Sequence, residues 1–170
     1  LALNWCVNEA KENCMIRLAI SPSPRTINIP DSHNFNIGKG TLLKDGKEAV
    51  IFTYGPVMLN EALIASDLLE KEDFSLKVIN MPWLNRVDQN WLDNAIKECE
   101  KVFILENHSY TGGLGDFLIN KIMQSRNQKN KEIIKFAPEG YPACGTPHEV
   151  LSYHGLDGKS MAENITGQIV

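Results

Sequence analysis

The chain has 170 residues, of which 43% are hydrophobic and 22% charged, a balance typical of a globular domain rather than a disordered or fibrous chain. Its 17 lysines and arginines against 21 aspartates and glutamates give a net charge of −4, and this acidic balance disfavours a nucleic-acid partner. No apolar run reaches the roughly 18 residues of a membrane span, and the N-terminus lacks a signal-peptide pattern, so we expect a cytoplasmic protein with no membrane partner.

The N-terminal region begins abruptly. Leu1 stands directly in a helix-like stretch, with no capping residue before it, and we therefore expect the chain to be the C-terminal piece of a longer protein. Residues 14–20 (CMIRLAI) form an apolar run that predicts a buried strand, and the two prolines of SPSPR then forbid further helix. Residues 26–47 show no sustained period and predict a linker that ends in a turn at Asp45-Gly46, a pair typical of hairpins.

From residue 48 onward, apolar strands alternate with amphipathic helices. Helices are expected after Gly55-Pro56, after an Asp88 cap, over residues 114–122, after the capping box of Thr146, Pro147 and Glu149, and around Met161, Ile165 and Ile169. The strands between them are predicted at residues 48–54, 76–81, 101–106 and 132–137. This alternation predicts a three-layer α/β/α fold with a mostly parallel sheet of about five strands.

Ligands of open α/β sheets bind beyond the carboxyl ends of the strands, and the exit after residues 101–106 is the richest in polar groups. Free backbone N–H groups at a helix start could hold an anion there, or the glycines could serve only a tight turn and close packing. Arginines flank the exit of the 14–20 strand, where they could grip a phosphate or carboxylate or form surface ion pairs. The candidate substrate- or anion-binding residues are Arg17, Arg25, Glu106, Asn107, His108, Gly112, Gly113 and Gly115.

The cysteines and tryptophans carry weaker signals. The four cysteines form no CxxC pair, and we expect them to be reduced and mostly buried: Cys6, Cys14, Cys99 and Cys144. Cys144, His148 and His154 do not share a helix face, which argues against a metal site. Trp5, Trp83 and Trp91 are expected to pack in the core or at an interface, because no basic stripe accompanies them.

Three motifs, in this order, resemble one enzyme family. They are a glycine turn after the strand EAVIFTY, an acidic-X-His strand exit followed by GGLG in ENHSYTGGLGD, and the helix start of CGTPHEVLSYHGLD. From about Glu48 to Val170 the chain resembles the C-terminal domain of transketolase-like thiamine diphosphate enzymes. This group includes transketolase, deoxyxylulose phosphate synthase and the beta subunits of 2-oxo-acid dehydrogenases.

The resemblance implies that residues 1–30 are the tail of a preceding pyrimidine-binding domain, 31–47 a linker and 48–170 the C-terminal domain. MIRLAISPSPR is similar to a segment in which relatives carry a sugar-phosphate-binding arginine, which points to Arg17 or Arg25. The full-length enzyme is then expected to be a homodimer that uses thiamine diphosphate and Mg²⁺ on a phosphorylated sugar or 2-oxo acid.

The same resemblance places the cofactor and metal sites upstream, on the remaining N-terminal domains or on a partner subunit. No catalytic, cofactor-binding or metal-binding residue is then expected in the fragment, which would support dimerisation, shape the substrate region and be inactive alone. The alternative is a stand-alone, non-catalytic α/β module that binds a small anion or a partner at the 106–116 turn.

Overall fold

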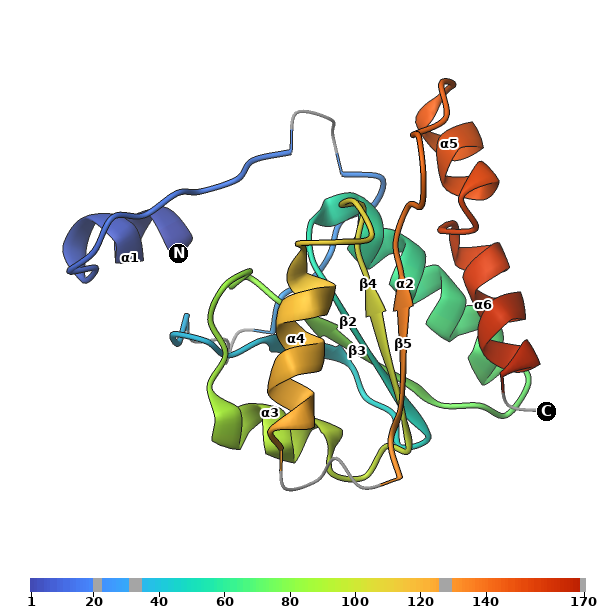
Figure 1. Cartoon of the computed structure of the whole chain (residues 1–170), viewed down its shortest axis with the longest axis horizontal. Helices are drawn as coiled ribbons and strands as arrows, with labels where there is room; N and C mark the ends of the chain where they lie inside the picture. The colour runs from blue at the N-terminus through green and yellow to red at the C-terminus, as the bar shows by residue number, and fades with distance from the viewer. Residues whose placement is uncertain (20–22, 31–34, 126–129, 169–170) are drawn as a thin grey trace.

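A five-stranded sheet runs through the centre of the computed structural model, which describes residues 1–19, 23–30, 35–125 and 130–168 (Figure 1). The strand order is β1-β3-β2-β4-β5, and only β1 runs antiparallel to its neighbour. This confirms the α/β class and the mostly parallel sheet of about five strands. The strands are β1 (Thr41–Lys44), β2 (Ala49–Thr53), β3 (Leu76–Asn80), β4 (Lys101–Leu105) and β5 (Glu132–Phe136).

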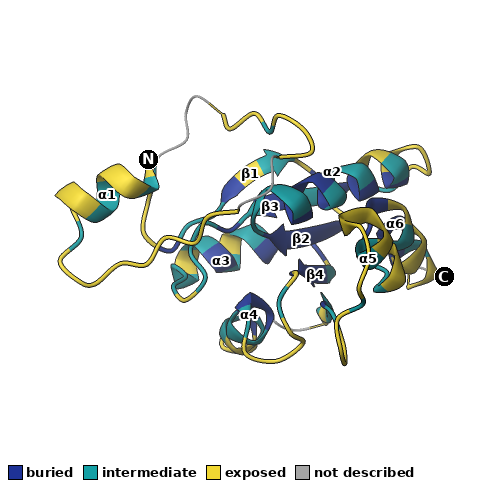
Figure 2. Ribbon diagram, turned by 90° about the horizontal axis from the view of Figure 1, so that it is seen from above, coloured by how far each residue is buried: buried dark blue, intermediate teal, exposed yellow. Residues whose placement is uncertain are grey.

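Helices cover both faces of the sheet (Figure 2). One face packs against α2 (Pro56–Glu70) and α6 (Gly158–Gly167), and the other against α3 (Gln89–Ile96) and α4 (Leu114–Met123). All five residues of β2 are buried, as expected for a central parallel strand covered on both sides. No helix within the described ranges is long and apolar enough to cross a membrane.

The helix starts follow the sequence prediction closely. The Asp88 carboxylate accepts a hydrogen bond from the Trp91 N–H at 2.9 Å and caps α3. The capping box at the start of α5 (Pro147–Tyr153) is formed, because the Glu149 carboxylate accepts hydrogen bonds from both N–H and Oγ1 of Thr146. In α6, Met161 and Ile165 are buried as expected, and Ile169 lies outside the described residues.

Strand β1 lies within residues 26–47, so the predicted linker is wrong over residues 41–44, and the hairpin of which Asp45-Gly46 is typical is not formed. Asp45 and Gly46 lie in the connection between β1 and β2, but β1 pairs with β3, since both edges of β2 are already occupied by the parallel strands β3 and β4. The chain therefore passes across the end of β3 between β1 and β2. Gly46 permits this crossing because it has no side chain. A Cβ at this position would lie only 2.5 Å from the backbone nitrogen of Lys77.

We call residues 1–19 the N-terminal arm. It contains α1 (Ala2–Asn8), which projects away from the sheet (Figure 1). The buried strand predicted at 14–20 is wrong over residues 14–19, which form no strand and are exposed; Met15 is 95% exposed. A strand needs a hydrogen-bonded neighbour, and the pairings of the described sheet do not include this segment.

Two contacts join the N-terminal arm to residues 83–86. The Trp5 ring packs edge-on against Trp83 with centroids 4.9 Å apart, and Phe35 packs against both tryptophans. Arg86 forms an ion pair with Glu12. Trp91 instead packs against the core residue Phe52, so the expectation that the tryptophans serve packing is confirmed for all three.

Candidate functional site

The carboxylate of Glu106 is the centre of the strand-exit edge. It follows β4 directly and is completely buried. Its Oε2 accepts a hydrogen bond from the Leu114 N–H at 2.8 Å, and its Oε1 accepts one from the Gly115 N–H at 3.0 Å. A negative charge at the N-terminus of α4 is favourable, because the first N–H groups of a helix lack partners and carry partial positive charge.

The glycines of the 106–116 turn make room for that carboxylate. A Cβ at Gly113 would collide with the carboxyl group of Glu106, and one at Gly115 would lie 2.7 Å from its Oε1. Gly112 has a φ of 84°, in the left-handed region that favours glycine. The tight turn and close packing weighed for these glycines are therefore present. An outside anion would have to compete with Glu106 for the amides of residues 114 and 115.

Lys135 ties the turn to β5. Its side chain is only 2% exposed, and its ammonium group forms an ion pair with Asp116, donates to the Tyr110 carbonyl and lies 4.1 Å from the centroid of the Tyr110 ring. The hydrogen bond from Lys135 lowers the pKa of Asp116, and a second one from the Gly112 N–H, at 2.7 Å, lowers it further. Sequence reasoning missed this pair, although a single lysine inside the apolar run EIIKFA is a signal for it.

The other residues of the turn face outward. Asn107 is exposed, and His108 is half-buried with its Nδ1 3.1 Å from the carbonyl oxygen of the next residue, Ser109. Neither contributes to the hydrogen bonds that hold Glu106. Their expected role in ligand binding stays a prediction.

The two candidate arginines lie far apart. Arg17, on the N-terminal arm, reaches the exit of β2, close enough to Tyr54 for its charge to act on the pKa of the phenol. Burial raises the pKa of Tyr54 and the Glu106 charge adds to this effect, whereas the adjacent Arg17 opposes it. Arg17 thus joins Glu106 at the strand-exit edge.

Arg25 lies elsewhere, with its Nη1 3.9 Å from the Asp67 carboxylate. Asp67 follows Pro56 by eleven residues on α2, about 16 Å further from the strand exits. The surface ion pair weighed for Arg25 is therefore present, and the structure does not bring Arg25 to the strand-exit edge.

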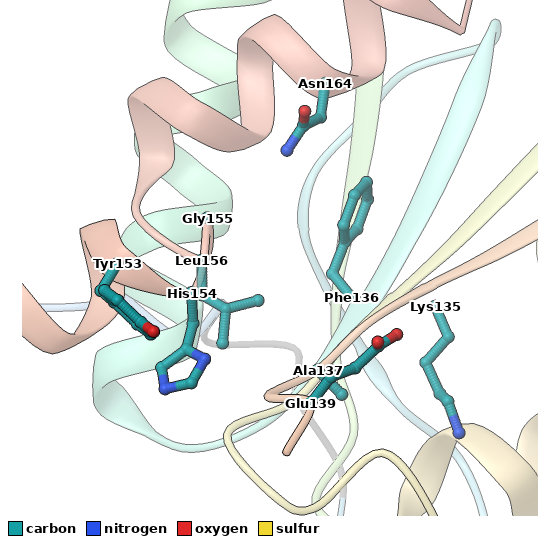
Figure 3. Close-up of a pocket in the computed structure, with 9 residues that line it drawn as sticks. All are labelled: Lys135, Phe136, Ala137, Glu139, Tyr153, His154, Gly155, Leu156 and Asn164. Carbon is teal, nitrogen blue, oxygen red and sulfur yellow. The ribbon is translucent and has the colours of Figure 1, made fainter. Parts of the chain in front are cut away.

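An open depression of about 340 Å³ lies beside this edge. Figure 3 shows that its walls come from the end of β5 and from the junction of α5 and α6. The ammonium of Lys135 is already paired with Asp116, and the Nε2 of His154 accepts a hydrogen bond from the Ala143 N–H at 3.2 Å. The lining residues are Lys135, Phe136, Ala137, Glu139, Tyr153, His154, Gly155, Leu156 and Asn164.

The cysteines differ from expectation in their exposure. All four are free thiols, but only Cys99 is buried; Cys6 is half-buried, and Cys14 and Cys144 are exposed. The expectation that most are buried is wrong, because Cys6 and Cys14 lie on the projecting arm and Cys144 lies in the loop before α5. In the part of the chain that the structure describes, no group of three or more His, Cys, Asp and Glu side chains is placed to hold a metal ion.

The fold and the strand-exit turn define an α/β domain with a doubly covered, mostly parallel sheet. Residues 38–161 match the family described as the transketolase C-terminal domain, and the chain belongs to this family. The resemblance inferred from the three sequence motifs is thereby confirmed.

Among similar proteins of known sequence, a Methanocaldococcus jannaschii protein named as a transketolase C-terminal section is 32% identical over 132 residues, which are 77% of this chain and 40% of that protein. The 1-deoxy-D-xylulose-5-phosphate synthase of Syntrophotalea carbinolica is 30% identical over 140 residues, 82% of this chain and 22% of that enzyme. A solved split-gene transketolase, described as an inactive beta4 tetramer, superposes with a TM-score of 0.72 at 26% identity, covering 84% of this chain and 46% of that one. The chain thus spans less than half the length of these relatives.

Proposed function

We propose that this chain is the C-terminal domain of a thiamine diphosphate-dependent enzyme of the transketolase type, which forms or transfers carbon–carbon bonds of ketose or 2-oxo acid substrates. The family match over residues 38–161 carries the proposal. Relatives named as transketolase and as deoxyxylulose phosphate synthase support it, since both names denote transferases that use this cofactor.

The described residues do not fit a magnesium–diphosphate site. Magnesium is held in proteins by free carboxylate and other oxygen ligands. Both oxygens of Glu106 already accept backbone hydrogen bonds, and Asp116 is paired with Lys135. We therefore assign the cofactor, its metal and the catalytic groups to the remaining N-terminal domains or to a partner subunit of the same enzyme.

The strand-exit edge is the part of this chain that we propose to face the substrate. Arg17 is exposed there beside Tyr54, and its guanidinium can bind a phosphate or carboxylate through two parallel hydrogen bonds. Glu106 keeps the 106–116 turn in one conformation by holding the start of α4. This supports a role in shaping the region that receives a phosphorylated sugar or a 2-oxo acid.

The N-terminal arm is the surface that we propose to join the other domains or subunit. It exposes large apolar side chains, and contiguous exposed apolar surface marks interaction sites. The name of the split-gene neighbour shows that a transketolase can be divided between genes, which supports a partner on a separate chain. The side chains are those of Leu1, Leu3, Val7, Met15, Ile16 and Leu18.

The test is to express the chain alone and together with the reading frame that lies next to it in its source genome. Ketol transfer between sugar phosphates, and condensation of pyruvate with an aldose phosphate, are assayed with thiamine diphosphate and Mg²⁺. We expect turnover only from the combined protein. Turnover by the chain alone, or a neighbouring frame that encodes no thiamine enzyme domain and adds no activity, would contradict the proposal.

The alternative of a stand-alone anion-binding module is disfavoured by the same geometry. Its best donors, the amides of Leu114 and Gly115, already donate to Glu106. Titration of the chain with inorganic phosphate, followed by amide NMR, distinguishes the two. Saturable shifts confined to residues 106–116 would favour the module.

A further inference from the structure

The open depression at the carboxyl end of β5 has walls that the fold holds in place. Its volume of about 340 Å³ is at the lower end of the range of small-molecule sites. One wall is the end of β5 with Phe136, and the other is the junction of α5 and α6, residues 153–156 (Figure 3). At this junction the Leu156 N–H donates to the Leu151 carbonyl at 2.8 Å and Gly155 has a φ of 66°, which end α5 as in a Schellman motif.

Gly155 and Asn164 give the depression its space and one polar side. Gly155 has no side chain, and a Cβ there would lie 3.7 Å from the Nδ2 of Asn164 on α6. A larger side chain at residue 155 would therefore extend toward the Asn164 amide. Figure 3 shows this amide pointing from α6 into the space above the junction. An amide group offers two donors at its nitrogen and an acceptor at its oxygen.

His154 supplies a donor on the opposite side. Its Nε2 accepts a hydrogen bond from the Ala143 N–H at 3.2 Å, and a ring nitrogen that accepts carries no proton. The proton of the neutral ring is therefore on Nδ1, and Figure 3 shows this nitrogen turned toward the end of β5. The Tyr153 ring packs edge-on against the His154 ring with centroids 5.1 Å apart, which brings a phenol hydroxyl to the rim.

The depression offers no free positive charge to an anion. Lys135 is the only lysine or arginine among the described residues that line it, and its ammonium is paired with Asp116. Its side chain points away from the junction of α5 and α6 (Figure 3). Glu139 is exposed at the rim, where its carboxylate would repel a phosphate or a carboxylate. The lining thus suits a neutral molecule that can both donate and accept hydrogen bonds.

We propose that this depression binds a neutral, hydroxyl-bearing ring of monosaccharide size, that is, an unphosphorylated sugar. Each sugar hydroxyl both donates and accepts, so neighbouring hydroxyls match the two ends of the Asn164 amide and the Nδ1–H of His154. The C–H face of the ring packs on Phe136, which is partly buried and stacked on Phe103 with centroids 5.8 Å apart. An ammonium compound fits less well, because it would meet donors where it needs acceptors.

This site is separate from the one proposed for a phosphorylated substrate. Arg17 acts at the exit of β2, and β4 lies between β2 and β5 in the sheet. The proposal is therefore independent of the enzyme assignment, and sugar binding by the chain alone tests it without any measurement of turnover.

The experiment titrates the whole chain with D-glucose, D-ribose and D-fructose and follows the amide NMR spectrum. We expect at least one of these sugars to give saturable shifts confined to residues 135–139, 153–156 and 164, with a Kd in the millimolar range because the site is open on one side. The phosphate esters D-glucose 6-phosphate, D-ribose 5-phosphate and D-fructose 6-phosphate should bind more weakly than their parent sugars, because Glu139 repels their charge.

Two asparagine variants make the test specific. Asn164→Leu keeps the bulk of the side chain but removes its donors and acceptor, and should weaken sugar binding at least about ten-fold. Asn94→Leu, at an exposed asparagine of α3 on the other face of the sheet, should leave the Kd unchanged. Far-UV circular dichroism checks that both variants are folded. Shifts that stay linear with every sugar, tighter binding of the esters, or the same affinity in both variants would overturn the proposal.

Discussion

At the scale of single residues, the strand-exit turn depends on one buried charge. Glu106 has no exposed surface, and two backbone N–H groups stabilise its carboxylate. Burying an ionised group is costly unless hydrogen bonds replace its hydration. The buried carboxylate therefore requires glycine at positions 113 and 115. A methyl group at either position would displace the carboxylate or the amides that hold it.

Glu106→Gln should destabilise the fold. The amide keeps the shape but loses the charge, and its NH₂ group faces an N–H where an acceptor is needed. We expect a loss of about 1–3 kcal/mol in the free energy of unfolding, measured by urea denaturation. Glu139→Gln, at an exposed carboxylate near the same edge, should change it by less than about 0.5 kcal/mol. Equal effects in both variants would show that Glu106 does not hold the turn.

Gly113→Ala and Gly167→Ala form a matched pair. The first places a methyl group against the Glu106 carboxylate and should cost about 1–3 kcal/mol. The second lies in α6 with no atom within 4 Å of its Cβ position, and should gain up to about 1 kcal/mol from helix propensity. Thermal unfolding measures both, and a stabilised Gly113→Ala variant would contradict the packing described for the turn.

The ion pair of Lys135 and Asp116 should make stability depend on pH. Because the pKa of Asp116 is lower in the folded chain than in the unfolded one, its ionised form stabilises the fold above about pH 4, and this contribution is lost as the pH falls through the folded pKa. Asp116→Asn should therefore flatten the fall in urea midpoint between about pH 5 and pH 2. The same change at the exposed Asp73 should leave the slope unaltered.

At the scale of elements, the sequence predicts those that bury a continuous apolar run or carry an explicit cap. β2, β3, β4 and β5 were predicted because their centres are apolar, and α3 and α5 because Asp88 and Thr146 mark their starts. β1 could not be predicted in the same way, since it is a four-residue edge strand whose Leu42 is exposed.

Residues 14–19 and the contacts of Glu106 could not be predicted from the sequence for the same reason. An apolar run shows that a segment needs a neighbour, but not whether this chain supplies one, and residues 14–19 form no strand with the described sheet. In the same way, the position of Glu106 at a strand exit was predictable. That its carboxylate turns inward to the amides of α4 depends on distances that only the folded chain defines.

The capping box of α5 shows how much N-terminal hydrogen bonds alone can stabilise a helix that has little packing. This helix buries none of its residues, so its N-terminal hydrogen bonds carry an unusual share of its stability. Thr146→Ala should cost about 0.5–2 kcal/mol locally. Amide hydrogen exchange should show it as faster exchange in residues 150–154 with little change in the sheet, whereas Ser152→Ala, exposed on the same helix, should leave these rates unchanged. A uniform loss of protection would mean that α5 unfolds only with the whole domain.

At the scale of the whole molecule, the domain core and the N-terminal arm differ in the exposure of their apolar side chains. The sheet is covered on both faces, yet the N-terminal arm leaves a run of large apolar side chains in contact with water. Its contacts with the rest of the domain, through Trp5, Glu12 and Arg17, leave these apolar side chains exposed. This exposure is the observation behind the proposal that the arm joins the remaining domains or a partner subunit.

The interface hypothesis predicts a difference between two exposed hydrophobic positions. Leu18→Asp, on the arm at 80% exposure, should weaken association with the remaining domains or partner subunit at least about ten-fold, because it buries an unpaired charge in the contact. Tyr141→Asp, at 97% exposure in the loop before α5, should leave the association unchanged. Both side chains are exposed in the isolated chain, so neither change should alter its own unfolding midpoint by more than about 0.5 kcal/mol. Sedimentation of each variant with the co-expressed neighbouring protein measures the association, and equal binding by both would place the interface elsewhere on the domain.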